Sequence, residues 1–212
     1  MLVDGAQSAP HMPVDLASLG CDFYAFTGHK MLGPTGVGGL IARPELLASI
    51  EPFMGGGEMI NDVTTEGSTW AEGPRKFEAG TPPIAEIVGL GAAAEYLTAI
   101  GMDQVRAHEL ALTDYALDAL KDLEGIRVFG PKDPTLRGCP VSFELPDVHA
   151  HDVAQYLDSQ GICVRAGHHC TKPLMGALGV TATARASMHV YTTTEDIDAL
   201  VRGLHGARRY FS

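Results

Sequence analysis

Apolar and polar positions predict a strand-rich first part of the chain. Leu2–Val3 reads as the end of a buried strand, and the aromatic run Asp22–Phe26 predicts a second strand that stops at a glycine. A third short strand is expected at Leu40–Ala42, after the glycine-dense stretch 33–39. Glycine and polar residues then dominate residues 54–83, so we expect a long excursion there, over the surface or across to a partner subunit.

The second part mixes helices and strands. Residues 84–123 have helical character, with an apolar face formed by Leu112, Ala116, Leu120 and Leu123 and with Asp114, Asp118 and Lys121 off that face. The remaining pattern predicts strands at 126–129, 141–145, 162–164 and 184–191, a helix around 153–157 that ends at Gly161, and a last helix from Thr194 whose apolar positions are Ile197, Leu200, Val201 and Leu204.

These elements predict an α/β protein with two parts. Residues 1–95 form an incomplete α/β sheet portion, and residues 96–212 form a complete small α+β domain. The first predicted strand is represented only by its final residues at the very start of the chain. We therefore expect the chain to be the carboxy-terminal part of a longer protein.

Composition narrows the class of protein. The 212 residues are 45% hydrophobic and 19% charged, which is typical of a globular protein. A net charge of -11 argues against nucleic acid or anionic membrane as the main partner, because both require a positive surface. No apolar run approaches the roughly 20 residues that span a bilayer, and no signal peptide opens the chain, so we expect a cytoplasmic protein.

The cysteines are expected to be free thiols. The four cysteines, at 21, 139, 163 and 170, show no C-x-x-C pairing, and a chain of this length builds a core without disulfides. Cys21 and Cys163, beside or within predicted strands, fit buried structural residues, and Cys139 at a strand start fits the same description.

Lys30 is the first candidate catalytic residue. It follows a predicted strand within the turn Thr27-Gly28-His29-Lys30, where a partly desolvated amine forms an imine with a carbonyl cofactor. The alternative from this motif alone is an ordinary solvated or paired lysine. Asp4, at the end of the preceding strand, favours the catalytic interpretation, because pyridoxal phosphate (PLP) chemistry needs a carboxylate against the pyridine nitrogen.

Five segments together resemble the SufS-type (group II) cysteine desulfurases of the class V PLP-dependent aminotransferase family. They are Val3–Gln7, Thr27–Gly36, Gly55–Ile60, Phe77–Pro82 and Arg165–Cys170, and the resemblance covers nearly the whole chain. It implies a fragment of the PLP-dependent transferase fold (fold type I, aspartate-aminotransferase-like), with part of the large-domain sheet followed by the small C-terminal domain.

The resemblance also implies roles for the cofactor-binding residues. Asp4 pairs with the pyridinium, Gln7 hydrogen-bonds the phenolic oxygen of the ring, and Lys30 is the Schiff-base lysine. Thr27 and His29 bind the phosphate.

The resemblance implies two further site residues, one that acts across a homodimer interface and one that binds the substrate. Thr81 reaches the phosphate of the neighbouring subunit. Arg185 takes the substrate carboxylate through its planar donor fork. A surface salt bridge is the alternative for Arg185 in the absence of the resemblance.

Cys170 is the candidate nucleophile. It lies between histidines and Thr171-Lys172-Pro173, just ahead of a short helix begun by Pro173, and imidazole, lysine and a helix amino terminus all stabilise a thiolate. Zinc binding by His168, His169 and Cys170 is the alternative, but adjacent ligands do not easily wrap one tetrahedral ion and no second ligand cluster is seen, so no metal is expected.

The implied activity is PLP-dependent cysteine desulfuration. L-cysteine gives L-alanine and a persulfide on Cys170, and a sulfur-acceptor protein of the SufE/SufU type takes the sulfur toward iron–sulfur cluster assembly. Selenocysteine lyase activity is one alternative, since L-selenocysteine suits the same scaffold. Another class V reaction is a second alternative. A catalytically inactive truncated fragment is a further alternative, because the family's first half carries the histidine that stacks on the PLP ring.

Overall fold

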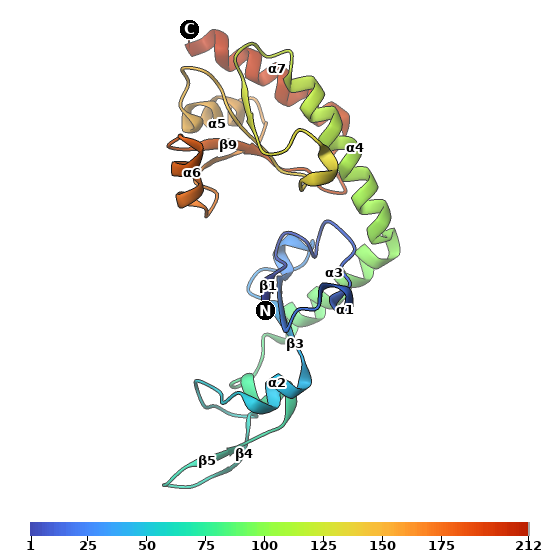
Figure 1. Ribbon diagram of the computed structural model, residues 1–212, viewed down its shortest axis with the longest axis vertical. Coiled ribbons are helices and arrows are strands. Elements are labelled where there is room, and N and C mark those ends of the chain that lie inside the picture. The colour runs from blue at the N-terminus through green and yellow to red at the C-terminus, as the bar shows by residue number, and fades with distance from the viewer. Residues whose placement is uncertain (212) are drawn as a thin grey trace. The chain divides into compact units, whose positions relative to one another are not determined.

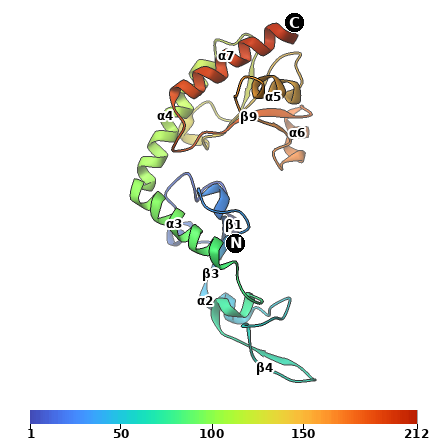
Figure 2. The ribbon, with the colours of Figure 1, turned by 180° about the vertical axis from the view of Figure 1, so that it is seen from behind.

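The structure is a computed structural model, and it describes residues 1–211. Two compact units make up the chain, Met1–Met102 and Asp103–Ser212. The domain boundary expected at 95/96 falls inside the helix α3, Ile84–Ile100, which continues to the positive-φ residue Gly101. We describe each unit by itself (Figures 1 and 2).

The first unit contains a three-stranded sheet in the order β1-β2-β3. Its strands are β1 (Leu2–Asp4), β2 (Phe23–Thr27) and β3 (Gly38–Ala42), as the sequence predicts. β1 and β2 run parallel, with Asp4 opposite Ala25, and β3 is antiparallel to β2. The carboxyl ends of β1 and β2 therefore lie at one edge of the sheet.

Short helical segments connect the strands of the first unit. They are α1 (Leu16–Leu19), the 3-10 turn η1 (Gly28–Lys30), α2 (Pro44–Ser49) and the 3-10 turn η2 (Gly73–Phe77). Asp15 caps α1 through hydrogen bonds from the backbone N–H groups of Ala17 and Ser18, and Gly20 ends it in the left-handed conformation.

The excursion at 54–83 contains a hairpin that the sequence did not predict. β4 (Ile60–Val63) and β5 (Ser68–Trp70) pair with each other and with no other strand among the described residues, as Figure 1 shows. Thr64 closes the turn, because its hydroxyl accepts hydrogen bonds from the N–H groups of Glu66 and Gly67. Alternating apolar positions are absent here, so local side-chain hydrogen bonds rather than burial shape this hairpin.

The second unit is built on a four-stranded antiparallel sheet in the order β6-β7-β9-β8. Its strands are β6 (Arg127–Phe129), β7 (Val141–Glu144), β8 (Arg165–Gly167) and β9 (Thr183–Ala186). Its helical elements are α4 (Met102–Leu120), η3 (Pro134–Leu136), α5 (Ala150–Asp158), α6 (Lys172–Leu178) and α7 (Thr194–Phe211).

Helices α4, α5 and α7 share one hydrophobic core with this sheet. The predicted apolar face of α4 is buried, as are the inward positions of α5 and α7, and they join Val141 and Phe143 of β7. Gly203 permits the close approach of α7 to α5, because a Cβ there would lie 2.5 Å from Leu157 Cδ2. The core thus holds the β8–β9 edge of the sheet in place.

Two predicted strands differ in position from those observed. Residues 162–164 are irregular and the strand begins at Arg165, while the strand expected over 184–191 ends at Ala186. Apolar β-branched residues at Ile162 and Val164 suggested a strand, but their side chains pack onto the core from an irregular segment.

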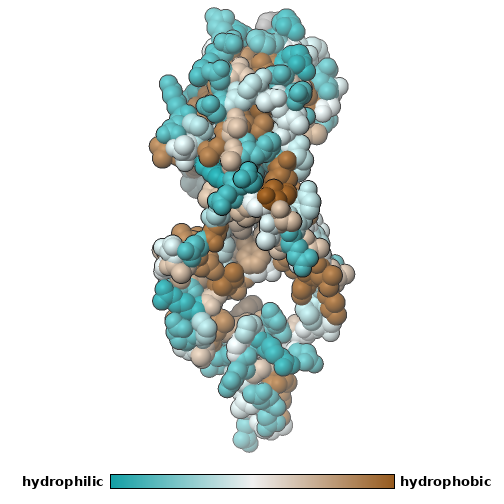
Figure 3. Space-filling model, turned by 90° about the vertical axis from the view of Figure 1, so that its right-hand side faces the viewer, coloured by the Kyte–Doolittle hydropathy of each residue, from teal (hydrophilic) through white to brown (hydrophobic). Residues whose placement is uncertain are grey.

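Apolar side chains also reach the surface, where Figure 3 shows them in brown among polar ones. The most exposed in the first unit are Phe53 at 93%, Val88 at 68% and Met1 at 63%. Within residues 1–211 no single helix is long and apolar enough to cross a membrane, although the consecutive helices α3 and α4 satisfy that test when taken together.

Candidate active site

The first group of candidate residues surrounds the carboxyl ends of β1 and β2. Asp4 is the last residue of β1, and its Oδ1 accepts a hydrogen bond of 2.9 Å from the N–H of Ala6. The parallel register sets Asp4 beside Ala25, two residues before Thr27 at the end of β2. Ligands of parallel α/β sheets bind at this end of the strands, so the sheet itself assembles this group.

A buried glycine lets the chain turn directly after Asp4. Gly5 lies against the ring of Tyr24, since a Cβ on Gly5 would be 2.0 Å from Tyr24 Cζ. The Tyr24 hydroxyl lies 2.8 Å from Ser8 Oγ, which ties the turn to β2. Gln7 follows in this turn and is exposed, as a side chain that meets a ligand must be.

The 3-10 turn after β2 carries the remaining residues of this group. Thr27 Oγ1 and His29 Nδ1 are 2.9 Å apart, and Lys30 is half-buried at the end of η1. Hydroxyl, imidazole and ammonium groups beside a carboxylate match the needs of a phosphate-bearing aldehyde with a basic ring nitrogen. The residues present therefore fit PLP.

Thr81 lies outside this turn but within the same unit. It is exposed and follows Gly80, whose φ of 80° is left-handed and whose N–H donates to the carbonyl of Gly57 at 2.9 Å. That hydrogen bond joins the segment Gly55–Ile60 to the segment Phe77–Pro82. The two motifs, separate in sequence, thus form one exposed loop structure.

Cys170 occupies a strained turn in the second unit. The N–H of Thr171 donates to the carbonyl of His168 at 2.8 Å, and the two central residues, His169 and Cys170, have φ of 52° and 64°. Such positive φ values in non-glycine residues cost about 1–3 kcal/mol each and are found mainly at functional sites. The thiol is exposed, which suits a nucleophile.

Arg165 is a site residue that the sequence did not identify. Its Nη2 lies 3.6 Å from Cys170 Sγ, so a charged guanidinium contacts the thiol. The signal was present in the sequence, since Arg165 opens the segment that ends at Cys170, but only the turn brings the two side chains together. Arg165 is thus a cationic neighbour in addition to Lys172 and the histidines, which the sequence analysis named.

Arg185 lies opposite Arg165 in the β8–β9 pair. Its Nε donates to Ser187 Oγ at 3.2 Å, and among residues 1–211 it forms no ion pair, so the salt-bridge alternative is not observed. Burial lowers the pKa of Arg185, and the charge of Arg165 adds to that effect. An arginine held this way is available to an anionic ligand.

The other cysteines divide between buried and exposed. Cys21 and Cys139 are buried, as expected. Cys163 is exposed and lies outside any strand, so the prediction that it is a buried strand residue is wrong. Cys170 and Cys163 are therefore the two exposed thiols among the described residues.

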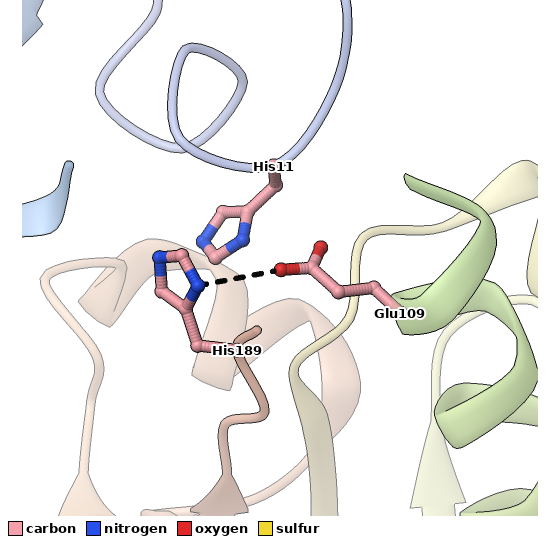
Figure 4. A group of neighbouring side chains, drawn as sticks. All are labelled: His11, Glu109 and His189. Carbon is pink, nitrogen blue, oxygen red and sulfur yellow. Dashed lines mark ion pairs between the residues drawn. The ribbon is translucent and has the colours of Figure 1, made fainter. Parts of the chain in front are cut away.

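A buried polar pair of the second unit was also missed by the sequence analysis (Figure 4). Glu109 of α4 is fully buried, and its Oε1 lies 3.8 Å from Nδ1 of His189. Burial raises the pKa of the Cys139 thiol to about 12, and the Glu109 carboxylate contributes in the same direction. This group is enclosed, which distinguishes it from the exposed Cys170 turn.

The sequence matches the family model described as aminotransferase class-V over residues 1–200. A probable cysteine desulfurase of Halalkalibacterium halodurans is 57% identical over 211 residues, covering 100% of this chain and 51% of that protein. A probable cysteine desulfurase of Streptomyces coelicolor is 54% identical over 209 residues, covering 99% and 50%. The chain thus spans about half the length of the curated relatives it matches.

Solved structures show the same similarity. The cysteine desulfurase CsdA from Escherichia coli superposes with a TM-score of 0.93 at 42% identity, over 99% of this chain and 51% of that one. A variant of C-DES with glycine covalently linked to the PLP cofactor gives a TM-score of 0.78 at 30% identity, over 94% of this chain and 50% of that one. The fold and the family are shared along nearly the whole chain.

Proposed function

The chain belongs to the aminotransferase class-V family, and we propose that it contributes the catalytic lysine and the sulfur-accepting cysteine of a PLP-dependent cysteine desulfurase. The single observation that carries the proposal is the Cys170 turn, which presents an exposed thiol 3.6 Å from the Arg165 guanidinium. Transamination has no use for such a thiol, whereas sulfur transfer requires one. The similarity to cysteine desulfurases along the whole chain supports the same activity.

PLP, when bound, supplies an electron sink that makes the α-proton of the substrate acidic and activates its sulfur for transfer. Asp4 would keep the pyridine nitrogen protonated through its carboxylate, and Gln7 would hydrogen-bond the phenolic oxygen. Thr27 and His29 hold the phosphate, and their 2.9 Å contact sets them side by side for that role. Lys30 would hold the cofactor through its amine, and the same amine would move the α-proton of the substrate.

Arg185 and Cys170 act on the substrate. The Arg185 fork binds the carboxylate of L-cysteine and orients its side chain. The Cys170 thiolate attacks the sulfur of the substrate, so that an S–S bond forms while the Cβ–S bond breaks and its electron pair stays with the substrate carbon. Protonation of that carbon completes L-alanine, and the sulfur remains as a persulfide. L-cysteine and a thiol thus become L-alanine and a persulfide without an external oxidant.

The wider setting of the reaction is also proposed. The active site belongs to a cytoplasmic homodimer, in which the exposed Thr81 reaches the phosphate bound by the other subunit. A SufE/SufU-type acceptor protein takes the sulfur from Cys170 toward iron–sulfur cluster assembly. The exposure of the thiol supports this last step, because an acceptor must reach the persulfide.

Mass spectrometry of the PLP-loaded protein after exposure to L-cysteine tests the proposal. We expect a sulfur adduct of about 32 Da on Cys170. Cys170→Ala should lose both the adduct and alanine formation, while the cofactor absorbance is retained. Cys163→Ala is the matched control, since Cys163 is also exposed, and it should keep both.

One outcome decides against the proposal, and a second supports the role of Cys170. Full turnover of L-cysteine by Cys170→Ala, with the adduct on another cysteine, would contradict the role of Cys170. Activity of the same variant on L-selenocysteine alone would instead assign the residue to sulfur transfer and leave a lyase reaction to the lysine, since selenium is the better leaving atom.

A further inference from the structure

The turn that presents Cys170 has a backbone that its residues do not favour. His168 and Thr171 close it, through the N–H of Thr171 and also through its Oγ1, which both donate to the His168 carbonyl at 2.8 Å. Two consecutive central residues with positive φ are the arrangement of a type I′ turn, which glycine, asparagine and aspartate dominate. Here the central positions hold His169 and Cys170. Something outside the turn must therefore hold it in this conformation.

The side chain of His169 supplies such an anchor. Its Nε2 lies 2.8 Å from Oγ1 of Thr183, and Thr183 is fully buried on β9, opposite Gly167 of β8. The anchor thus joins the turn to the strand beside the one from which the turn emerges. His169 Nδ1 is also buried and has no hydrogen-bond partner within residues 1–211, so the ring is fixed through Nε2, at Thr183.

We infer that His169 is a positioning residue for the Cys170 thiol, whose hydrogen bond to Thr183 holds the left-handed turn that presents the thiol to Arg165. The thiol-to-guanidinium distance of 3.6 Å exists only while the turn keeps its shape, because Arg165 lies on β8 and Cys170 lies beyond it. The role of this thiol as sulfur acceptor rests on the proposed function, whereas the positioning of the thiol does not.

The charge state of His169 agrees with this role. Burial lowers the pKa of His169, and the nearby positive charge of Arg185 acts in the same direction. A protonated imidazole would need two acceptors, whereas only Nε2 has a partner. A neutral ring makes the contact between Nε2 and the Thr183 hydroxyl without a third positive charge beside Arg165 and Arg185.

Alkylation of the chain by iodoacetamide, followed peptide by peptide in mass spectrometry across pH, tests the inference. The thiolate is the reacting form, so the pH midpoint of the rate profile serves as the readout of how the thiol is held. Thr183→Val removes the hydroxyl at nearly constant volume. We expect it to move the midpoint to higher pH and to slow alkylation at pH 7 about tenfold, because the thiol loses its contact with the charged Arg165 guanidinium.

Two substitutions of His169 separate the anchor from backbone preference. His169→Gln keeps a hydrogen-bonding amide near the position of Nε2, and should retain the wild-type midpoint. His169→Asn favours the left-handed backbone but is too short to reach Thr183, and should shift the midpoint as Thr183→Val does. The double variant His169→Asn with Thr183→Val should show no further shift, because both changes break one contact.

Internal controls come from the other cysteines. Cys163 should react at its wild-type rate in every variant, and Cys21 and Cys139 should stay protected if the fold is intact. A wild-type midpoint in Thr183→Val, additive shifts in the double variant, or a wild-type midpoint in His169→Asn would each overturn the inference. The assay needs neither cofactor nor L-cysteine. A protein that shows these shifts but forms no persulfide on Cys170 would therefore contradict the proposed function alone.

Discussion

Arg165 on β8 lies directly opposite Arg185 on β9, so two guanidinium groups share one face of the sheet. Like charges in this position are ordinarily destabilising, and no carboxylate within residues 1–211 forms an ion pair with either of them. The arrangement is consistent with a site that two anions occupy in turn, the Cys170 thiolate beside Arg165 and the substrate carboxylate beside Arg185. The two arginines should therefore differ in the kinetic constant that each controls.

Replacement of each arginine by glutamine should separate these roles. Arg185→Gln should raise KM for L-cysteine about tenfold or more, because a hydrogen bond to a charged group contributes about 1.5–3 kcal/mol. Arg165→Gln should chiefly lower kcat, since it leaves the Cys170 thiol without its cationic neighbour. Both variants should unfold at the wild-type temperature or slightly above, because a like-charge pair is removed. Equal effects on KM would show that the two arginines bind one anion together.

Covalent attachment of PLP tests the first group of site residues. Borohydride reduction of the loaded protein should fix the cofactor on Lys30, and Lys30→Ala should lose the yellow absorbance of the bound cofactor. Asp4→Ala should retain much of the binding but lose most of the catalysis, because its carboxylate acts on the ring nitrogen during the reaction. Peptide mapping that finds the reduced cofactor on Lys76, the buried lysine of the same unit, would contradict the assignment.

Much of the fold is predictable from local pattern, because burial and periodicity coincide in its central elements. The face of α4 formed by Leu112, Ala116 and Leu120 is fully buried, and Val141 and Phe143 of β7 alternate as expected. The exposed hairpin β4–β5 is different in kind. Its strands bury little and rely on backbone pairing and turn hydrogen bonds, which leave no apolar alternation in the sequence.

The candidate site shows the same division. The positions of Asp4 at the end of β1 and of Lys30 in the turn after β2 could be predicted, because both residues lie in recognisable motifs. The contacts of Arg165 and Thr183 could not be predicted. They arise from a turn with two left-handed residues and from strand register, and both depend on contacts distant in sequence. Cys163 was misassigned because the apolar residues around it pack onto the core from an irregular segment.

The packing of α5 against α7 depends on the absence of a side chain at Gly203. A Cβ there would lie 2.5 Å from Leu157 Cδ2 and 2.9 Å from Ile162 Cδ1, so Gly203→Ala should destabilise the second unit by about 1–3 kcal/mol in urea denaturation. Gly176→Ala in α6 is the matched control. A Cβ at that glycine meets nothing within 4 Å, so the helix preference for alanine should make the variant neutral or more stable by up to about 1 kcal/mol.

Alkaline pH should destabilise the second unit through Cys139. Burial and the nearby Glu109 carboxylate raise the pKa of this thiol from 9.0 to about 12 in the folded chain. The unfolded chain therefore releases the proton near pH 9 while the folded chain retains it, and the free energy of unfolding should fall from about pH 9 up to about pH 12. Denaturant titrations across this range measure how steeply the free energy of unfolding falls with pH.

Cys139→Ala should be less stable at pH 7, because it leaves a cavity, but its free energy of unfolding should decline less steeply above pH 9. Tyrosines and lysines also titrate here, so the difference between the two slopes is the quantity to compare. Parallel curves for the two proteins would show that Cys139 does not carry the alkaline sensitivity.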